Sequence, residues 1–177
     1  MEHLNEQAQA LLAMPELIAD ALVGEALVAA AKPENLKSAL TRLSVVVGEA
    51  LNNPAIRSSL QQRTAQLLAT DVDGVIPQRP FHGALSFPEV FGLRSTGFDA
   101  MVGNPPFLGG QRLTGSMGTA FRNYLVAYIA NGKRGSADLV AYFFLQVYRL
   151  VKDSGNFGLM ATNSIAEGDT RQVGLEA

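Results

Sequence analysis

The sequence of 177 residues contains no cysteine, no tryptophan and only two histidines. The absence of cysteine excludes disulfide scaffolds, cysteine zinc sites, iron–sulfur clusters and thiol catalysis, and it fits a reducing compartment. Charged residues are scarce at 17%, but 47% of the residues are hydrophobic, so a packed core is expected instead of disorder. No metal site is predicted.

Neither an excess of positive charge nor a long hydrophobic run is present. Fourteen Lys and Arg face sixteen Asp and Glu, for a net charge of -2. This balance excludes a polycation held to nucleic acid by bulk charge, so any nucleic-acid contact must be local. The amino terminus carries Glu2, Glu6 and Glu16 where an export signal would be basic. The sequence therefore predicts a cytoplasmic protein without a membrane segment.

Glycine divides the chain into two parts of different character. Residues 1–73 contain two of the 17 glycines, and residues 74–177 contain the other fifteen. The first part is rich in alanine, leucine and glutamate, which favour helix, whereas the second is rich in turn-forming residues. We therefore predict a helical segment over 1–73, serving as a spacer or insertion, a connector over 74–97 and an α/β domain over 98–177.

Three helices are expected in the helical segment. The first runs from residue 5 to residue 31 and is broken or kinked at Pro15, which cannot donate an interior helix hydrogen bond. The second begins at Pro33, a residue suited to the first helical turn. The third follows Asn53, whose side chain can cap the helix. Their apolar stripes are interpreted as packing surfaces.

The order of elements in the second part favours an α/β crossover unit. Within the connector, residues 85–91 favour a short irregular strand. The elements expected after it are a strand over 98–102, a glycine-rich loop over 108–118, helices over 119–130 and 137–151, a turn over 153–155 and a buried strand over 157–162.

The tetrapeptide Asn104-Pro105-Pro106-Phe107 follows the first expected strand, at the edge where parallel sheets bind their ligands. An exocyclic amino group on a base is a poor nucleophile because its lone pair is delocalised into the ring. The side-chain oxygen of Asn104 and the carbonyl of Pro105 can accept hydrogen bonds from that group and localise the pair. The two prolines fix the turn, and Phe107 offers a ring for stacking on a base. The alternative is a strand end followed by a core phenylalanine.

Three segments resemble a known family. They read FHGALSFPEVF, FDAMVGNPPFLGG and SADLVAYFFLQVYRLVKDSGNFGLMATNSI, within residues 81–172. They resemble the large adenine-N6 DNA methyltransferases of restriction-modification and related phage-defence systems, in which NPPF is the catalytic motif. The resemblance implies a class I, Rossmann-like methyltransferase sheet, of which residues 98–177 form a part. It also implies that Asn104, Pro105, Pro106 and Phe107 are catalytic and that adenine N6 in DNA is methylated.

The resemblance further implies S-adenosylmethionine as the cofactor. Asp138, Leu139 and Phe143 match the DLxxxF segment of the family, where the aromatic residue lies near the cofactor adenine and the target base. On this basis Asp138 and Phe143 are predicted to bind the cofactor. A helix cap at Asp138 and a core position for Phe143 remain open as alternatives.

A local DNA contact surface is predicted beside the motif. No acidic residue lies between Asp99 and Asp138, whereas the interval contains four basic residues, Arg112, Arg122, Lys133 and Arg134. Such residues would position a duplex with a flipped adenine through its phosphates, without reading its sequence. A solvated basic face is the alternative for each of them. Asn163, with Ser164 and Arg171, is predicted to line the same cleft.

One expected feature of such a methylase is missing. The glycine-rich turn that holds S-adenosylmethionine should precede NPPF, and residues 1–97 contain no such pattern. We therefore expect this chain to be a piece of a methylase that acts with the missing parts of its parent. Two other readings stay open: a non-catalytic or decayed fragment that serves as a DNA-binding or assembly module, and a methyltransferase acting on a glutamine amide of a protein.

Overall fold

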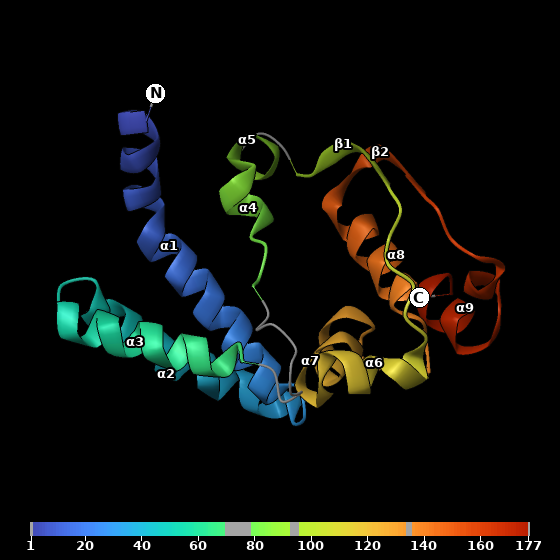
Figure 1. Cartoon of the computed structure of the whole chain (residues 1–177), viewed down its shortest axis with the longest axis horizontal. Helices are drawn as coiled ribbons and strands as arrows, with labels where there is room; N and C mark the ends of the chain where they lie inside the picture. Colours follow the sequence, from blue (N-terminus) through green and yellow to red (C-terminus); the bar gives the residue numbers. More distant parts are fainter. Residues whose placement is uncertain (1, 70–78, 93–95, 134–135, 177) are drawn as a thin grey trace. The chain divides into compact units, whose positions relative to one another are not determined.

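The computed structural model describes residues 2–69, 79–92, 96–133 and 136–176, coloured along the chain in Figure 1. These residues fall into two compact units. The first contains the described residues up to 69 together with 79–86, and the second contains those from 87 onward. Because the predicted boundary at residue 73 and part of the connector lie outside the described residues, the division into 1–73, 74–97 and 98–177 stays a prediction.

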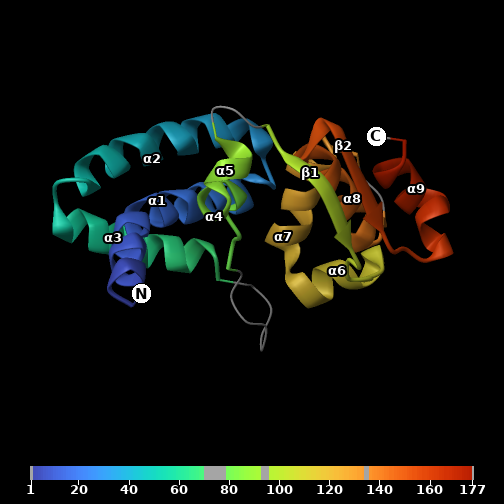
Figure 2. The same ribbon diagram turned by 90° about the horizontal axis from the view of Figure 1, so that it is seen from above.

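The first unit is a small helical bundle. Its elements are α1 (Glu2–Ala29), the 3-10 turn η1 (Pro33–Asn35), α2 (Leu36–Ala50), α3 (Pro54–Leu67) and α4 (Gly83–Ser86). Figure 2 shows α1, α2 and α3 lying alongside one another. Their shared core consists of Leu17, Ala21, Leu43, Ala50 and Leu60. The three predicted helices and their role as packing surfaces are confirmed.

The local signals at Pro15 and Asn53 both have an effect on the helices. Pro15 lies inside α1, which continues through it without a break. Figure 1 shows the axis of α1 changing direction in its amino-terminal part, as a proline kink requires. Asn53 caps α3 as predicted, since its Oδ1 accepts hydrogen bonds from the backbone of Ala55 at 3.0 Å and of Ile56 at 3.4 Å.

One charged side chain is buried in the bundle. The side chain of Glu25 on α1 is 9% exposed, and Arg63 on α3 donates to its Oε1 at 2.6 Å from Nη2 and 3.1 Å from Nε. A buried carboxylate is costly unless a cation and hydrogen bonds compensate for the lost water. Arg63 therefore fixes α3 against α1.

The second unit combines helices with two strands. Its elements are α5 (Pro88–Phe91), β1 (Phe98–Gly103), α6 (Gly110–Met117), α7 (Thr119–Tyr124), the π-helix η2 (Leu125–Ile129), α8 (Leu139–Leu150), β2 (Val151–Leu159), the 3-10 turn η3 (Asn163–Ala166) and α9 (Gly168–Gly174). Its core gathers residues from α6, η2, α8 and α9, among them Leu113, Ile129, Ala141, Tyr142 and Val173.

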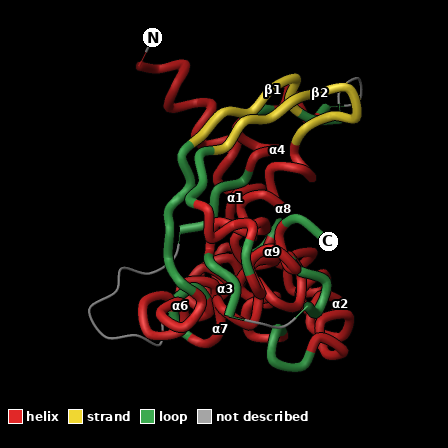
Figure 3. Tube along the Cα trace, turned by 90° about the vertical axis from the view of Figure 1, so that its right-hand side faces the viewer, coloured by secondary structure: helices red, strands yellow, loops and turns green. Residues whose placement is uncertain are grey.

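The strands β1 and β2 pair in parallel, and Figure 3 draws them side by side in yellow. Met101, Val102 and Gly103 face Phe157, Gly158 and Leu159 in register. The register shifts between Phe98 and Ala100, which face Val151 and Asn156, so β2 carries extra residues there. The predicted turn over 153–155 is this irregularity inside one strand. The described chain is thus a mixed α/β protein, mostly helical, with a two-stranded parallel sheet.

Three expectations about the second part of the chain are wrong. Residues 85–91 form the helical turns α4 and α5 instead of a strand, because Pro88 begins a helical turn at α5. The glycine-rich stretch over 108–118 contains the helix α6 instead of an open loop. The strand expected to be buried over 157–162 ends at Leu159 and is largely exposed, with Phe157 at 41% and Met160 at 67%, because Phe144 of α8 covers Phe157 only in part.

No helix among the described residues is both long and apolar enough to cross a membrane.

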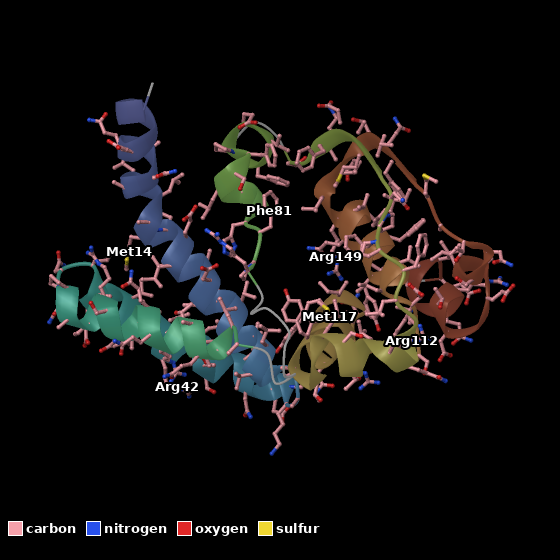
Figure 4. The ribbon with its side chains drawn as sticks, in the orientation of Figure 1. Met14, Arg42, Phe81, Arg112, Met117 and Arg149 are labelled. Atoms are coloured by element: carbon pink, nitrogen blue, oxygen red, sulfur yellow. The ribbon has the colours of Figure 1, made fainter. Side chains whose placement is uncertain are left out.

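Replacement of Arg63 by leucine is expected to destabilise the first unit. It leaves the carboxylate of Glu25 buried without its partner, and since Arg63 itself is largely exposed the loss should be about 1–3 kcal/mol. Urea unfolding followed by circular dichroism measures this change. Arg42→Leu is the matched control, because Arg42 is an exposed side chain on α2 (Figure 4). Equal destabilisation by both variants would show that the Glu25–Arg63 pair contributes nothing.

Candidate active site

The Asn104–Phe107 segment begins directly after β1, whose last residue is Gly103. Asn104, Pro106 and Phe107 are exposed and Pro105 is buried. Within the described part of the chain, neither the Asn104 amide nor the Pro105 carbonyl has a hydrogen-bond partner. Phe107 is 44% exposed, so part of its side chain is open to solvent. The segment therefore presents free acceptors and an accessible aromatic ring.

Both ends of this segment are fixed by hydrogen bonds. Before it, the carbonyl of Gly103 accepts from the Met160 amide at 3.0 Å, which extends the pairing of the two strands by one residue. After it, the Leu108 amide donates to Oδ1 of Asp138 at 3.2 Å, and the Leu108 carbonyl accepts from the Leu139 amide at 3.0 Å. The loop is thus tied to β2 at one end and to the start of α8 at the other.

Asp138 is the amino-terminal cap of α8. The same Oδ1 that accepts from Leu108 also accepts from the Val140 amide at 3.0 Å. The capping alternative is therefore confirmed for Asp138, and the cap also holds the loop. Its predicted contact with a cofactor stays a prediction.

Phe143 lies in a pocket of about 210 Å³ and is 39% exposed, so it is not a plain core residue. The pocket opens between the α7–η2 segment and one face of α8. Its lining is mostly aromatic and aliphatic: Phe121, Tyr124, Leu125, Ile129, Leu139, Tyr142, Phe143 and Gln146. Burial raises the pKa of Tyr124 and of Tyr142 above the ordinary phenol value, opposed by the charges of Arg149 and Arg122 respectively. Both phenols therefore stay neutral at physiological pH.

One wall of the pocket is a π-helical turn. This conformation is rare in proteins, and where it occurs it often lies at a functional site. Arg149 of α8, labelled in Figure 4, donates to the carbonyls of Tyr128 at 3.0 Å and Ile129 at 2.8 Å. These carbonyls lie at the carboxyl-terminal end of η2. Asn131 follows in the left-handed region with φ 50°. Arg149 therefore holds the π-helical turn in place.

The segment before β1 supports the start of the sheet. Phe87 and Phe91 both pack edge-on against Phe98, with ring centroids 5.5 Å and 5.3 Å apart. Phe87 and Phe91 belong to the FPEVF segment. Edge-to-face contacts of this kind stabilise by about 0.5–1.5 kcal/mol beyond area burial.

The predicted DNA-contacting residues occupy different environments. Arg112 is exposed on α6 and borders a hollow of about 430 Å³ with Gly109, Gly110 and Ser136 (Figure 4). Arg122 is half-buried on α7. The Nζ of Lys133 donates to the carbonyls of Glu176 at 2.9 Å and Gln172 at 3.5 Å.

The last two predicted contacts are less defined. Asn163 is exposed in η3, the turn that follows β2. Arg134 lies outside the described residues. No distance places Asn163 against the Asn104–Phe107 loop, so its role in the same cleft stays a prediction.

Two side chains from α9 were not identified from the sequence. Oγ1 of Thr170 accepts from the Asp138 amide at 3.2 Å, and Oδ2 of Asp169 accepts from the Ser136 amide at 2.6 Å. Both contacts span more than thirty residues of sequence. No local pattern could have found them, because each acts on the main chain of a distant segment. In the described residues no group of three or more His, Cys, Asp or Glu side chains could hold a metal ion.

A model of the Eco57I restriction-modification methylase family matches residues 30–173. Because the match covers most of its length, the chain belongs to this family. Membership supports a DNA methyltransferase-type function associated with restriction-modification, and methylases of this family generally use S-adenosylmethionine. A search of the curated proteins found no match, and neither did a search of the solved structures.

Substitution of Gly110 by alanine is expected to destabilise the second unit by about 1–3 kcal/mol, because overpacking forces backbone to move. A Cβ on Gly110 would lie 2.3 Å from the Ser136 carbonyl carbon and oxygen, so α6 could not stay against the segment that leads into α8. Thermal unfolding monitored by circular dichroism measures the loss.

Gly115 of the same helix provides the matched control. A Cβ there meets nothing within 4 Å, so Gly115→Ala should stabilise α6 by roughly 0.5–1 kcal/mol through helix propensity. The same sign of change for both variants would contradict the packing of Gly110 on Ser136.

Proposed function

We propose that the chain is the part of a methylase that binds the amino group of the target adenine. The whole methylase would transfer a methyl group from S-adenosylmethionine to adenine N6 in DNA. The observation that carries this proposal is the Asn104–Phe107 loop, which is anchored at both ends and exposes its amide and its aromatic ring. Membership of the methylase family supports the same chemistry.

The proposed chemistry follows from two acceptors of the loop that have no partner among the described residues. The Asn104 amide oxygen and the Pro105 carbonyl accept the two hydrogens of the adenine amino group, which draws its lone pair out of the ring. Neither acceptor is occupied by another described residue. No strong base is needed before methyl transfer, because the proton leaves from a nitrogen that has already become cationic. The loop thus activates a nucleophile with fixed acceptors.

Phe107 holds the target base. An adenine inside a duplex cannot reach the loop, so the base is flipped out of the stack. The exposed ring of Phe107 then stacks on it, a contact that contributes roughly 1–3 kcal/mol in nucleic-acid sites. Arg112 at the hollow beside α6 is best placed to bind a flanking phosphate, because its side chain is exposed and the exposed Gly109 borders the same hollow. Arg122, Lys133, Arg134 and Asn163 are the further candidates for DNA contact.

The described residues fit only part of an S-adenosylmethionine site. Phe143 and its pocket can take a flat ring, but Oδ1 of Asp138 already accepts two main-chain amides. No described strand is followed by a glycine-rich turn that would hold the methionine portion. When bound, the cofactor supplies an electrophilic methyl group, and we assign its main binding site to other parts of the parent methylase.

The two strands are part of a larger Rossmann-like sheet in this proposal. Parallel sheets are normally covered on both faces, whereas Val102 is 90% exposed and Phe157 is 41% exposed. Further strands and helices from the parent methylase would cover these residues. A non-catalytic DNA-binding or assembly module is the second candidate, favoured by the incomplete cofactor site.

Asn104→Ala in the methylase that carries this chain is expected to lower adenine methylation by about two to three orders of magnitude, as loss of one transition-state acceptor does. DNA binding should persist, because Asn104 contacts the base only after flipping. Methyl transfer from labelled cofactor and a DNA binding assay measure the two effects.

Asn156→Ala is the control for Asn104, because Asn156 is an exposed asparagine on β2 outside the motif. It should leave methylation unchanged. Unchanged methylation in Asn104→Ala would contradict the proposed chemistry, and no methylation in the natural protein would favour the non-catalytic module.

Arg112→Ala is expected to weaken DNA binding similarly for all sequences and to reduce the salt dependence of log K by about 0.9, the contribution of one phosphate contact. Lys133→Ala should change the slope less, because its ammonium group is already bound to the Glu176 carbonyl. Fluorescence anisotropy titrations at several salt concentrations measure the slopes. Identical slopes for Arg112→Ala and the natural protein would remove Arg112 from the DNA contact surface.

A further inference from the structure

Thr170 is a buried polar residue at the start of α9, with 8% of its surface exposed. Its hydroxyl oxygen accepts a hydrogen bond from the Asp138 amide at 3.2 Å. The neighbouring Asp169 accepts from the Ser136 amide at 2.6 Å. The first turn of α9 therefore binds the backbone of the segment that leads into α8.

That segment in turn fixes the Asn104–Phe107 loop. The carboxylate of Asp138 accepts from Leu108, the residue directly after Phe107, and the Leu108 carbonyl accepts from Leu139. Because Oδ1 of Asp138 is shared between Leu108 and Val140, its direction must satisfy both amides at once. A small rotation of the Asp138 backbone would lengthen one of these bonds.

We propose that Thr170 is a positioning residue for the Asn104–Phe107 loop and acts through Asp138. The Thr170 hydroxyl accepts from the Asp138 amide, and the Asp138 carboxylate accepts from the Leu108 amide. Because Leu108 follows Phe107 directly, these bonds fix the position of the loop. Functional groups must be kept within about 0.5 Å of their working geometry, which makes such support from outside the site necessary.

The hydrogen bond of Thr170 is separate from the packing contact between α9 and α8. Apolar and small residues of α9 make the packing contact with α8: Val173 is 1% exposed within the core, and Gly174 lies so close that a Cβ would be 3.0 Å from the Ala141 Cβ. Thr170 adds a directed hydrogen bond at the one point where α9 meets the cap of α8. The two kinds of contact can therefore be separated by substitution.

A reporter of loop position tests the proposal without an activity assay. The 177-residue chain contains no tryptophan, so Phe107→Trp places a single indole in the loop at a position that is 44% exposed. Thr170→Val, which removes the acceptor at nearly constant shape, should increase acrylamide quenching of this indole and broaden its emission. Thr170→Ser, which retains a hydroxyl, should leave both unchanged.

Two further variants keep the outcome interpretable. Val173→Ala removes packing from the same helix, so it should lower the melting temperature but leave quenching unchanged. Asp138→Ser retains a side chain that caps helices but is too short to reach Leu108 as well, so it should release the loop as Thr170→Val does. If Thr170→Val does not fold, the quenching of Asp138→Ser tests the proposal in its place. Equal quenching in Thr170→Val and Val173→Ala, or no change in Asp138→Ser, would overturn the proposal.

An activity arm rests on the proposed function and is measured with Phe107 in place. In the methylase that carries this chain, Thr170→Val should lower kcat by on the order of tenfold to a hundredfold with little change in KM for DNA, because misplacement by about an ångström has effects of that size. Thr170→Ser should retain most of the activity. Absence of methylation in the natural protein, with the quenching pattern as expected, would refute the proposed function and leave the positioning role intact.

Discussion

The candidate site depends on one carboxylate oxygen that serves two segments of the chain. Oδ1 of Asp138 accepts the amide that begins α8 and the amide of Leu108 that ends the Asn104–Phe107 loop. A helix cap normally satisfies only its own helix. Here the cap also fixes a loop thirty residues away relative to α8, through its hydrogen bond with Leu108. The exposed groups of the loop can remain free for a ligand, because main-chain groups on either side of them carry the anchoring bonds.

Local sequence rules predicted the three helices of the first unit and the first strand of the second. Three helices lie where the composition placed them, Asn53 caps α3, and the first strand begins at Phe98 as expected. These features depend on residues a few positions apart, so a sequence contains all the information that they require. The motif loop also follows β1 directly, because Pro105 and Pro106, which follow Asn104, cannot continue a ladder of hydrogen bonds.

The features that the sequence did not predict depend on distant partners. The glycine-rich stretch contains α6, in which Gly110 approaches Ser136 more closely than a residue with a side chain could. The FPEVF segment turns helical and brings Phe87 and Phe91 onto Phe98, which propensity alone could not distinguish from a strand. Thr170 carries no signal at all, since its partner is a main-chain amide on another element. In this protein the position of the motif loop directly after the first strand could be predicted from the sequence, whereas the hydrogen bonds from distant segments that support the loop could not.

The exposure of the sheet shows how a local sequence pattern can depend on packing partners that the pattern does not name. Phe157 on β2 and Met160 after it are among the apolar residues that predicted a buried strand, but they are 41% and 67% exposed, and Val102 on β1 is 90% exposed. A parallel pair with so little cover gains little from burial, so its hydrogen bonds to each other and the packing of α8 must hold it. Phe144 of α8 makes such a contact, edge-on to Phe157 at 6.1 Å. The prediction of burial was therefore wrong for the described residues, and the reason is physical. The apolar composition of a strand indicates that other segments should pack on it, but it does not indicate that neighbouring segments of the sequence do so.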